Sequence, residues 1–313
     1  MQDVLQWGVE LIRAIQTIES PALTAVMKAL TFTGSEYFYL LALPVVFWAV
    51  DEKLGARLGV VFMMSTFVNA WLKVVFAQPR PFNLDPSVGL AHETSYGLPS
   101  GHAQGVSSFW GLLAPAIARP WGMILAIGLP LLIGFTRLYL GVHFPTDVLL
   151  GLALGWGFAF AGTVLSDRVV ALFMRWRRIW RIVLVATVSI VMNALLPEDT
   201  SASGVFLGTA VGAIFMFEKV RFEARSGTIA RKAVRLLLGL AGLAVLYVGV
   251  KMIAPGEGEA NYALFRFVRY GLLGAWVSFG APWVFVKTGL AGVSEANPSL
   301  SGSVRSGSAH REV

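Results

Sequence analysis

The chain has 313 residues, of which 56% are hydrophobic and only 14% are charged, and its mean hydropathy is +0.68. Charged residues make up roughly a quarter of a soluble domain, so this composition excludes an ordinary soluble protein and predicts an integral membrane protein. The absence of cysteine excludes disulfides and thiolate metal sites. We assign the net charge of +7 to cytoplasmic loops rather than to nucleic-acid binding.

The first 32 residues contain two short amphipathic segments. Residues 4–18 mix apolar with polar side chains, and Pro21 begins a second segment that ends near Phe32. A spanning helix needs roughly 20 apolar residues, so residues 1–32 are predicted to form two helices that lie in the membrane interface. One bent spanning helix is the alternative. We expect no cleavable signal peptide, because acidic residues interrupt the segment and no basic stretch precedes it.

Nine apolar segments follow and are candidate membrane spans: 36–50, 55–77, 103–118, 121–141, 145–165, 179–196, 203–218, 233–253 and 268–287. The predicted fold class is therefore all-α, a polytopic transmembrane helical bundle. An arginine-rich stretch near residues 167–181 separates a motif-bearing core, residues 33–167, from a motif-free extension of about four transmembrane helices, residues 168–290. Residues 291–313 are rich in Ser and Gly and are predicted to be disordered.

Glycines recur at every fourth position in one segment of the extension, at Gly204, Gly208 and Gly212. Small residues at this spacing line one face of a helix and allow close helix contact in lipid. We expect the extension as a whole to pack against the catalytic bundle or another protomer, and to shape lipid access rather than perform chemistry.

Lysine and arginine are unevenly divided between the two sides of the predicted bundle. Seventeen of the 25 lie in loops 51–57, 119–120, 166–181 and 218–235 or toward the C-terminal tail. Cytoplasmic loops carry an excess of these residues, so these loops and the C-terminus are predicted to be cytoplasmic. Loops 78–102 and 136–147 then face the extracytoplasmic side. The expected location is a bacterial inner membrane or a plasma membrane.

His143 and Asp147 stand four residues apart, and Pro145 between them suits the first turn of a helix. The two side chains then share one helix face. Asp147 can accept a hydrogen bond from one imidazole nitrogen, which leaves the other nitrogen free to attack. Arg137 lies just upstream and adds a positive charge. The alternative is a buried His–Asp pair that only stabilises the start of a helix.

Pro99-Ser100-Gly101-His102 forms a turn that enters an apolar segment. Free N–H groups near Ser100 and Gly101 suit phosphate oxygens at a helix N-terminus, although Ser100 is equally acceptable as an ordinary helix cap. His102 adds a second imidazole, so one histidine can act as nucleophile and the other as acid.

Lys73 ends an apolar segment, and Arg80 follows seven residues later. A snorkelling lysine and a juxtamembrane arginine are the plain alternative. Charged residues so close to membrane spans are costly and usually functional, and these two lie on the same predicted side as the two histidines. The combined set is suited to holding a phosphate and attacking it.

Together these segments resemble the signature of the type 2 phosphatidic acid phosphatase (PAP2) superfamily. That signature reads Lys-x6-Arg-Pro, then Pro-Ser-Gly-His, then Ser-Arg-x5-His-x3-Asp. The matching residues are Lys73, Arg80-Pro81, Pro99 to His102, Thr136-Arg137, His143 and Asp147. Thr136 replaces the usual serine but keeps its hydroxyl. Residues 168–290 have no specific counterpart, although similar four-helix extensions occur in some lipid-phosphatase and sphingosine-phosphate phosphatase-like members.

The resemblance implies a PAP2-type catalytic core that hydrolyses a lipid phosphomonoester or pyrophosphate without a metal or cofactor. It implies that His143 forms a phosphohistidine, that Asp147 orients His143, and that His102 protonates the leaving oxygen. The implied phosphate-binding residues are Lys73, Arg80, Ser100, Gly101 and Arg137. The expected partners are a phosphorylated lipid substrate and membrane lipids, and the identity of the lipid and the oligomeric state stay open.

Two other functions remain alternatives: a lipid phosphotransferase that uses the same phosphohistidine, and an anion or lipid transporter. A nucleophile oriented by a carboxylate favours chemistry over transport. Among weaker candidates, His92 and Glu93 are interpreted as parts of a surface loop, with contact to the substrate as the alternative. Arg266 and Arg269 are interpreted as interfacial anchors, with the binding of a second anionic group as the alternative.

Overall fold

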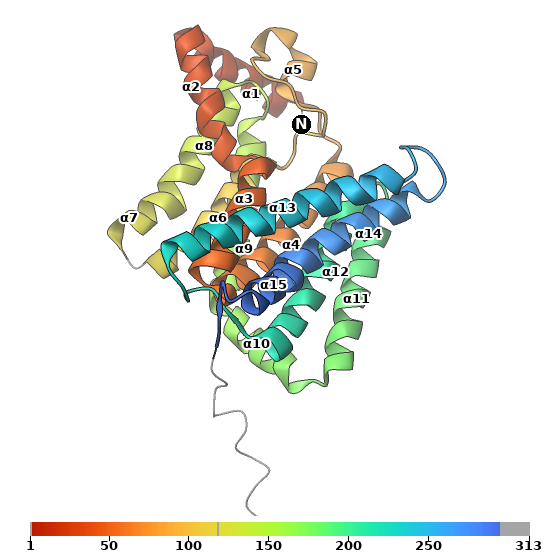
Figure 1. The fold of residues 1–313 in the computed structure, drawn as a ribbon. Helices are drawn as coiled ribbons and strands as arrows, with labels where there is room; N and C mark the ends of the chain where they lie inside the picture. Colours follow the sequence, from red (N-terminus) through yellow and green to blue (C-terminus); the bar gives the residue numbers. More distant parts are fainter. Residues whose placement is uncertain (1, 118, 295–313) are drawn as a thin grey trace, which may run out of the picture.

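The computed structural model describes residues 2–117 and 119–294, and most of both ranges is helical (Figure 1). The N-terminal half contains α1 (Gln2–Ile15), α2 (Pro21–Thr31), α3 (Glu36–Val45), α4 (Glu52–Phe76), α5 (Pro81–Leu84), α6 (Gly101–Ile117), α7 (Pro120–Met123), α8 (Leu129–Tyr139) and α9 (Pro145–Val164). The C-terminal half contains α10 (Ser166–Arg175), α11 (Arg178–Leu195), α12 (Thr200–Phe215), α13 (Ile229–Ile253), α14 (Tyr262–Ala275), α15 (Ala281–Lys287) and the short strands β1 (Phe222–Glu223) and β2 (Gly292–Val293). Each of the nine predicted segments is helical, which confirms the all-α class.

Six helical stretches within the described ranges are long and apolar enough to cross a membrane: Glu52–Leu84, Pro120–Tyr139, Pro145–Val164, Arg178–Leu195, Thr200–Val220 and Ile229–Ile253. The stretches 21–34 and 36–50 form a seventh candidate only as a pair, bent by 46°. The expectation of nine separate spans is therefore too high by this measure. One of the missing three is α6, whose described part, Gly101–Ile117, has 17 residues.

Helix α1 packs directly on the loops that carry the predicted site residues. Val9 and Ile12 on its apolar face are buried against Val88 and Phe144. At its end, Gln16 donates one hydrogen bond to the carbonyl of Val88 and one to that of Tyr139, each 2.8 Å long. The position of residues 1–32 in a membrane interface stays a prediction.

Helices α6 and α9 approach closely because glycines of α9 face α6. A side chain at Gly151 would lie 2.6 Å from the carbonyl oxygen of Ser100, and one at Gly155 would lie 2.0 Å from Ser107 Oγ. The backbone N–H of Ser100 donates to the carbonyl of Asp147 at 2.9 Å. This packing fixes the turn before α6 against the start of α9.

The glycine face of α12 lies against α14, as the spacing of its glycines predicted. A side chain at Gly204 would meet the carbonyl of Phe267 at 2.5 Å, and one at Gly208 would meet the carbonyl of Gly271 at 1.9 Å. The extension also packs directly on the core, because Phe67 of α4 shares a buried cluster with Val185 and Phe206.

Arg235 of α13 joins the extension to the core at the opposite end from the motif loops. Its guanidinium is fully buried and donates to the carbonyls of Trp48, Ala224, Ser226 and Leu290. Next to it, β1 and β2 pair in an antiparallel arrangement. The predicted disorder from residue 291 is therefore wrong for residues 291–294, because β2 lies there. Residues 295–313 lie outside the described part.

The loops assigned to the cytoplasm gather at one end of the bundle. Arg225 pairs with Asp51 at 2.8 Å, and Arg57 pairs with Asp167. The motif loops lie at the other end, where α1, α2 and α5 appear at the top of Figure 1 and α10 at the bottom. The structure therefore agrees with the predicted grouping of loops.

Candidate active site

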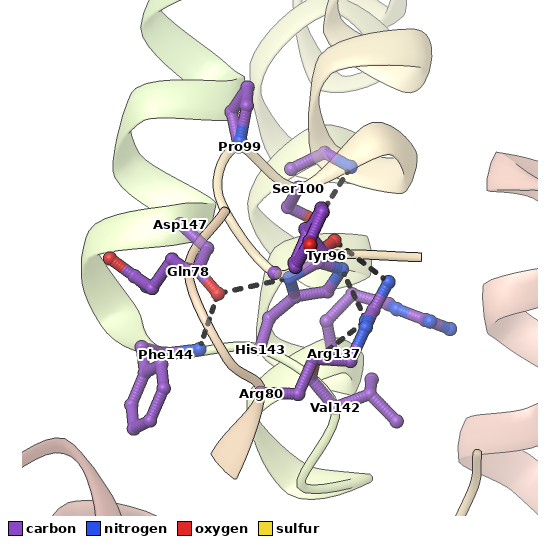
Figure 2. Close-up of polar contacts among 12 residues, drawn as sticks. Gln78, Arg80, Tyr96, Pro99, Ser100, Arg137, Val142, His143, Phe144 and Asp147 are labelled. Carbon is purple, nitrogen blue, oxygen red and sulfur yellow. Dashed lines mark hydrogen bonds and ion pairs between the residues drawn. The ribbon is translucent and has the colours of Figure 1, made fainter. Parts of the chain in front are cut away.

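The start of α9 carries the His–Asp pair in the predicted orientation. His143 Nδ1 lies 3.1 Å from Asp147 Oδ2, and the same oxygen accepts the backbone N–H of Phe144 at 2.9 Å (Figure 2). Gln78 Nε2 donates to Asp147 Oδ1 at 2.6 Å. Asp147 is fully buried, so three donors fix a carboxylate that would otherwise be costly to desolvate.

This arrangement assigns the protonation of His143. An ionised carboxylate only accepts, so Nδ1 carries the proton and Nε2 carries the free electron pair. Burial lowers the pKa of His143 well below its ordinary value, and the charges of Arg80 and Lys73 lower it further. The imidazole is therefore uncharged at neutral pH, which is the form that a nucleophile requires.

Arg80 links the pair to the loop between α5 and α6. Its Nη1 donates to the carbonyl of Val142 at 2.8 Å and lies 3.3 Å from His143 Nε2. Its Nε and Nη2 donate to the carbonyl and hydroxyl oxygens of Ser95 at 2.6 and 3.1 Å. Figure 2 shows the guanidinium and the imidazole facing each other. Arg80 is thus held by several acceptors, with one edge against His143 Nε2.

Lys73 and Arg137 reach the same cluster from α4 and α8. The ammonium group of Lys73 donates to the carbonyls of Tyr96 and Gly97. Arg137 is 3% exposed; it donates to Thr31 Oγ1 at 3.0 Å and forms an ion pair with Glu93. Glu93 is therefore part of the site, and its interpretation as a bland surface residue is wrong.

The neighbouring residue His92 contacts an aromatic ring instead of the basic cluster. Its ring packs edge-on against Phe82, with ring centroids 5.2 Å apart. The different environments of His92 and Glu93 could not be predicted from the sequence, because only the folded chain brings Glu93 next to Arg137.

A cavity of about 490 Å³ lies beside the cluster. His102, Gly101 and Glu93 form part of its polar lining, and Tyr39 and Phe62 form part of its apolar lining. His102 lies against Gly34, where an added side chain would come within 3.1 Å of its ring. The second predicted imidazole therefore faces a space that is large enough for a ligand.

The turn before α6 is supported by a buried polar network that the sequence analysis missed. Asn69 Nδ2 donates to Gln104 Oε1 at 2.8 Å, and Gln104 Nε2 donates to the carbonyl of Ser65 at 2.7 Å. Ser65 Oγ in turn lies 2.8 Å from Ser108 Oγ. Polar residues four apart in both α4 and α6 were an available signal, because such residues inside spans usually pair.

Ser100 is fully buried, and its hydroxyl is 3.5 Å from the N–H of Ala103. This geometry fits a helix cap, and a phosphate-binding role for Ser100 and Gly101 stays a prediction. The turn between α8 and α9 depends on Gly141, which has a φ of +66°. A side chain there would lie 1.8 Å from the carbonyl of Val88, so this position requires glycine.

All eight predicted site residues come from one end of the bundle. Direct contacts link His143 with Asp147 and Arg80. His102 and Gly101 line the cavity beside them. The sequence analysis missed the partners that hold them: Gln78, Ser95, Glu93 and the Asn69–Gln104 pair.

Two family profiles match this chain, one in each half of the fold. A profile of the PAP2 superfamily matches residues 54–171. A second profile, described as the transmembrane extension of PAP2 superfamily phosphatases, matches residues 200–293. The extension thus has a counterpart, and its match begins later than the predicted boundary at residue 168.

The chain is similar to an undecaprenyl-diphosphatase of Sulfolobus acidocaldarius, with 35% identity over 48% of this chain and 73% of that protein. It is 32% identical to a probable sphingosine-1-phosphate phosphatase of Dictyostelium discoideum over 46% of this chain and 39% of the relative. Among solved structures, a PAP2-type phosphatidylglycerolphosphate phosphatase from Bacillus subtilis is 27% identical to this chain. The alignment covers 54% of this chain and 88% of the Bacillus chain, with a TM-score of 0.48.

Every residue of the His143 cluster that the motifs predicted lies within the stretch matched by the first profile. The relatives named above are phosphatases of membrane lipids. Their likeness thus coincides with the chemistry that the geometry supports, and this integral membrane chain belongs to the PAP2 superfamily of phosphatases.

Proposed function

We propose that this protein hydrolyses a phosphomonoester or pyrophosphate bond of a membrane lipid through a phosphohistidine on His143. The observation that carries the proposal is the orientation of His143. Asp147 holds the proton on Nδ1, and Nε2 accepts a long hydrogen bond of 3.3 Å from Arg80 Nη1. A phosphate bound to Arg80 is thereby placed against an uncharged nucleophile.

The proposed reaction has two steps. His143 Nε2 attacks phosphorus, the bond to the lipid oxygen breaks, and His102 gives that oxygen its proton. Water then attacks the phosphohistidine, His102 accepts the proton of the water, and inorganic phosphate leaves. Lys73, Arg80 and Arg137 stabilise the charge on the phosphoryl oxygens, as preorganised donors do. Ser100 and the Gly101 amide are assigned to the same phosphate site.

The proposed reaction needs no metal ion. Both oxygens of Asp147 already accept hydrogen bonds from N–H groups, and Glu93 is paired with Arg137. The cations that neutralise phosphate are instead the three basic side chains. These residues therefore offer too few free ligands for a catalytic metal of the usual geometry.

A lipid substrate is supported by the cavity, whose polar lining of His102 and Glu93 adjoins the rings of Tyr39 and Phe62. Such a lining suits a phosphate attached to a hydrocarbon chain. The similar proteins include an undecaprenyl-diphosphatase and a probable sphingosine-1-phosphate phosphatase. Both substrate classes are consistent with three cations around one nucleophile.

The test is phosphate release by the purified protein in detergent, assayed with a panel of lipid monophosphates and diphosphates. We expect activity to persist unchanged in excess EDTA. Vanadate, which adopts the five-coordinate geometry of the transition state, is expected to inhibit. Activity that disappears in EDTA and returns with Mg²⁺ or Zn²⁺ would refute the metal-free reaction.

We further propose that the site opens on the extracytoplasmic side, since the basic loops lie at the opposite end of the bundle. The prediction is that a cysteine at Ser87 reacts with a membrane-impermeant maleimide in intact cells. One at Arg177 is expected to react only after lysis. Both positions are exposed, and the natural chain has no cysteine to interfere. The reverse labelling pattern would overturn this orientation.

A further inference from the structure

Five arginines are buried in the described part of the chain, and four of them have oxygen acceptors. Arg80 and Arg235 donate to backbone carbonyls, whereas Arg137 and Arg181 pair with Glu93 and Glu218. The fifth is Arg269 of α14, which is 7% exposed. Within residues 2–117 and 119–294 it has no hydrogen bond or ion pair, and its Nε is fully buried without a partner.

Aromatic rings surround this guanidinium. It lies over the ring of Tyr247 from α13 at 5.1 Å and over that of Tyr270 at 5.4 Å. Cation–π contacts recover only part of the hydration that a guanidinium loses on burial. The nearby carboxylate of Asp199 is already paired with Arg266 at 3.0 Å. Arg269 therefore has a charge and free donors but no anion within the described protein.

Arg269 lies close to one end of the α13–α14 pair. Tyr247 is six residues before the end of α13 at Ile253, and Arg269 is seven residues after the start of α14 at Tyr262. At 1.5 Å per residue, both are about 10 Å from the loop that joins the two helices. Arginines this near a helix end reach the phosphate level of a bilayer. Figure 1 shows that loop at the right-hand edge of the bundle, away from α10.

We propose that Arg269, with the hydroxyls of Tyr247 and Tyr270, binds the phosphate of an anionic phospholipid headgroup between α13 and α14. A guanidinium donates two parallel hydrogen bonds to a phosphate, and neither phenol makes a hydrogen bond within the described residues. Tyr247 is 38% exposed, so a lipid can reach the pair from the side. The site is separate from His143 and does not depend on the proposed reaction. It favours the binding of an anionic group by Arg269 over its interpretation as an interfacial anchor.

The test compares the melting temperature of the purified protein in neutral detergent with and without phosphatidylglycerol. We expect Tm to rise by about 5 °C when the lipid is in hundredfold excess over its Kd. Arg269→Gln is expected to abolish this rise. Lys251→Gln removes the same charge from an exposed position on the same end of α13, and it is expected to keep the full rise.

The same Tm measurement with two other compounds identifies the ligand. Phosphatidylcholine and inorganic phosphate are each expected to give less than a third of the rise. An equal rise with inorganic phosphate alone would show that the site takes a soluble anion and overturn the lipid assignment. An equal rise in wild type and Arg269→Gln would overturn the site itself.

Tyr247→Phe keeps the ring over Arg269 but removes one hydroxyl, so it provides a readout even if Arg269→Gln fails to fold. We expect a reduced rise in Tm and fewer retained phosphatidylglycerol molecules by native mass spectrometry. An unchanged rise together with an unchanged lipid count would remove the tyrosines from the site.

Discussion

Replacing His143 by alanine is expected to lower phosphate release by about 10⁴-fold or more, the scale of loss when a nucleophile is deleted from a preorganised site. The neighbouring cations remain in place, because Arg80 is held by Ser95 and Val142 independently of the imidazole. Binding of vanadate is therefore expected to survive in part. Phosphate release and vanadate affinity, measured on the same preparation, separate the chemical role of His143 from a structural one.

His92→Ala is the matched control for this variant. It removes an imidazole from the same end of the protein, where the ring contacts Phe82 rather than the cluster. We expect this control to retain activity within a few-fold of wild type. Near-normal phosphate release by His143→Ala would eliminate His143 as the nucleophile and leave the phosphohistidine step without support.

The His143–Asp147 contact was predictable because it is local. Four residues is one turn of a helix, and Pro145 sets the start of that turn, so the spacing alone places both side chains on one face. Glycine spacing was informative in the same way for α12: it identified the face that packs closely. It did not identify α14 as the partner, because helix periodicity contains no information about which helix lies opposite.

The contacts that sequence reasoning missed all connect distant segments. Glu93 reaches Arg137, and Gln78 reaches Asp147 across 69 residues. Arg235 is held by carbonyls from four separate positions. These pairings depend on how the helices pack, and no local pattern distinguishes Glu93 from any other acidic loop residue. The motifs therefore located the chemistry, whereas the supporting partners required the three-dimensional arrangement.

The nine candidate spans and the six long apolar helices of the described residues differ for a simpler reason. Hydropathy alone does not distinguish a helix that faces lipid from one that is buried among other helices. Helix α6 reads as apolar, yet Gln104, Ser107 and Ser108 are all buried within the bundle. Its described part, Gly101–Ile117, has 17 residues, so its length keeps it out of the six candidate spans.

Asp147→Asn is expected to lower phosphate release by about 10³- to 10⁴-fold while KM changes little. In the native site Asp147 Oδ2 accepts from both His143 Nδ1 and Phe144 N, and Oδ1 accepts from Gln78. An asparagine must turn an NH₂ group toward one of these donors. If it faces His143, the proton moves to Nε2 and the attacking electron pair is lost.

If the NH₂ group instead faces Gln78, the Gln78 amide can rotate to accept it and the tautomer of His143 survives. The negative charge is still lost, so the positive imidazole that forms on phosphoryl transfer loses its neighbouring anion. Both orientations therefore slow the chemical step without disturbing Arg80 or Lys73. The matched control is Asp167→Asn, which removes an exposed carboxylate paired with Arg57 and is expected to leave kcat unchanged. An Asp147→Asn enzyme that keeps its Tm and retains kcat within tenfold of wild type would show that His143 reacts without an orienting carboxylate.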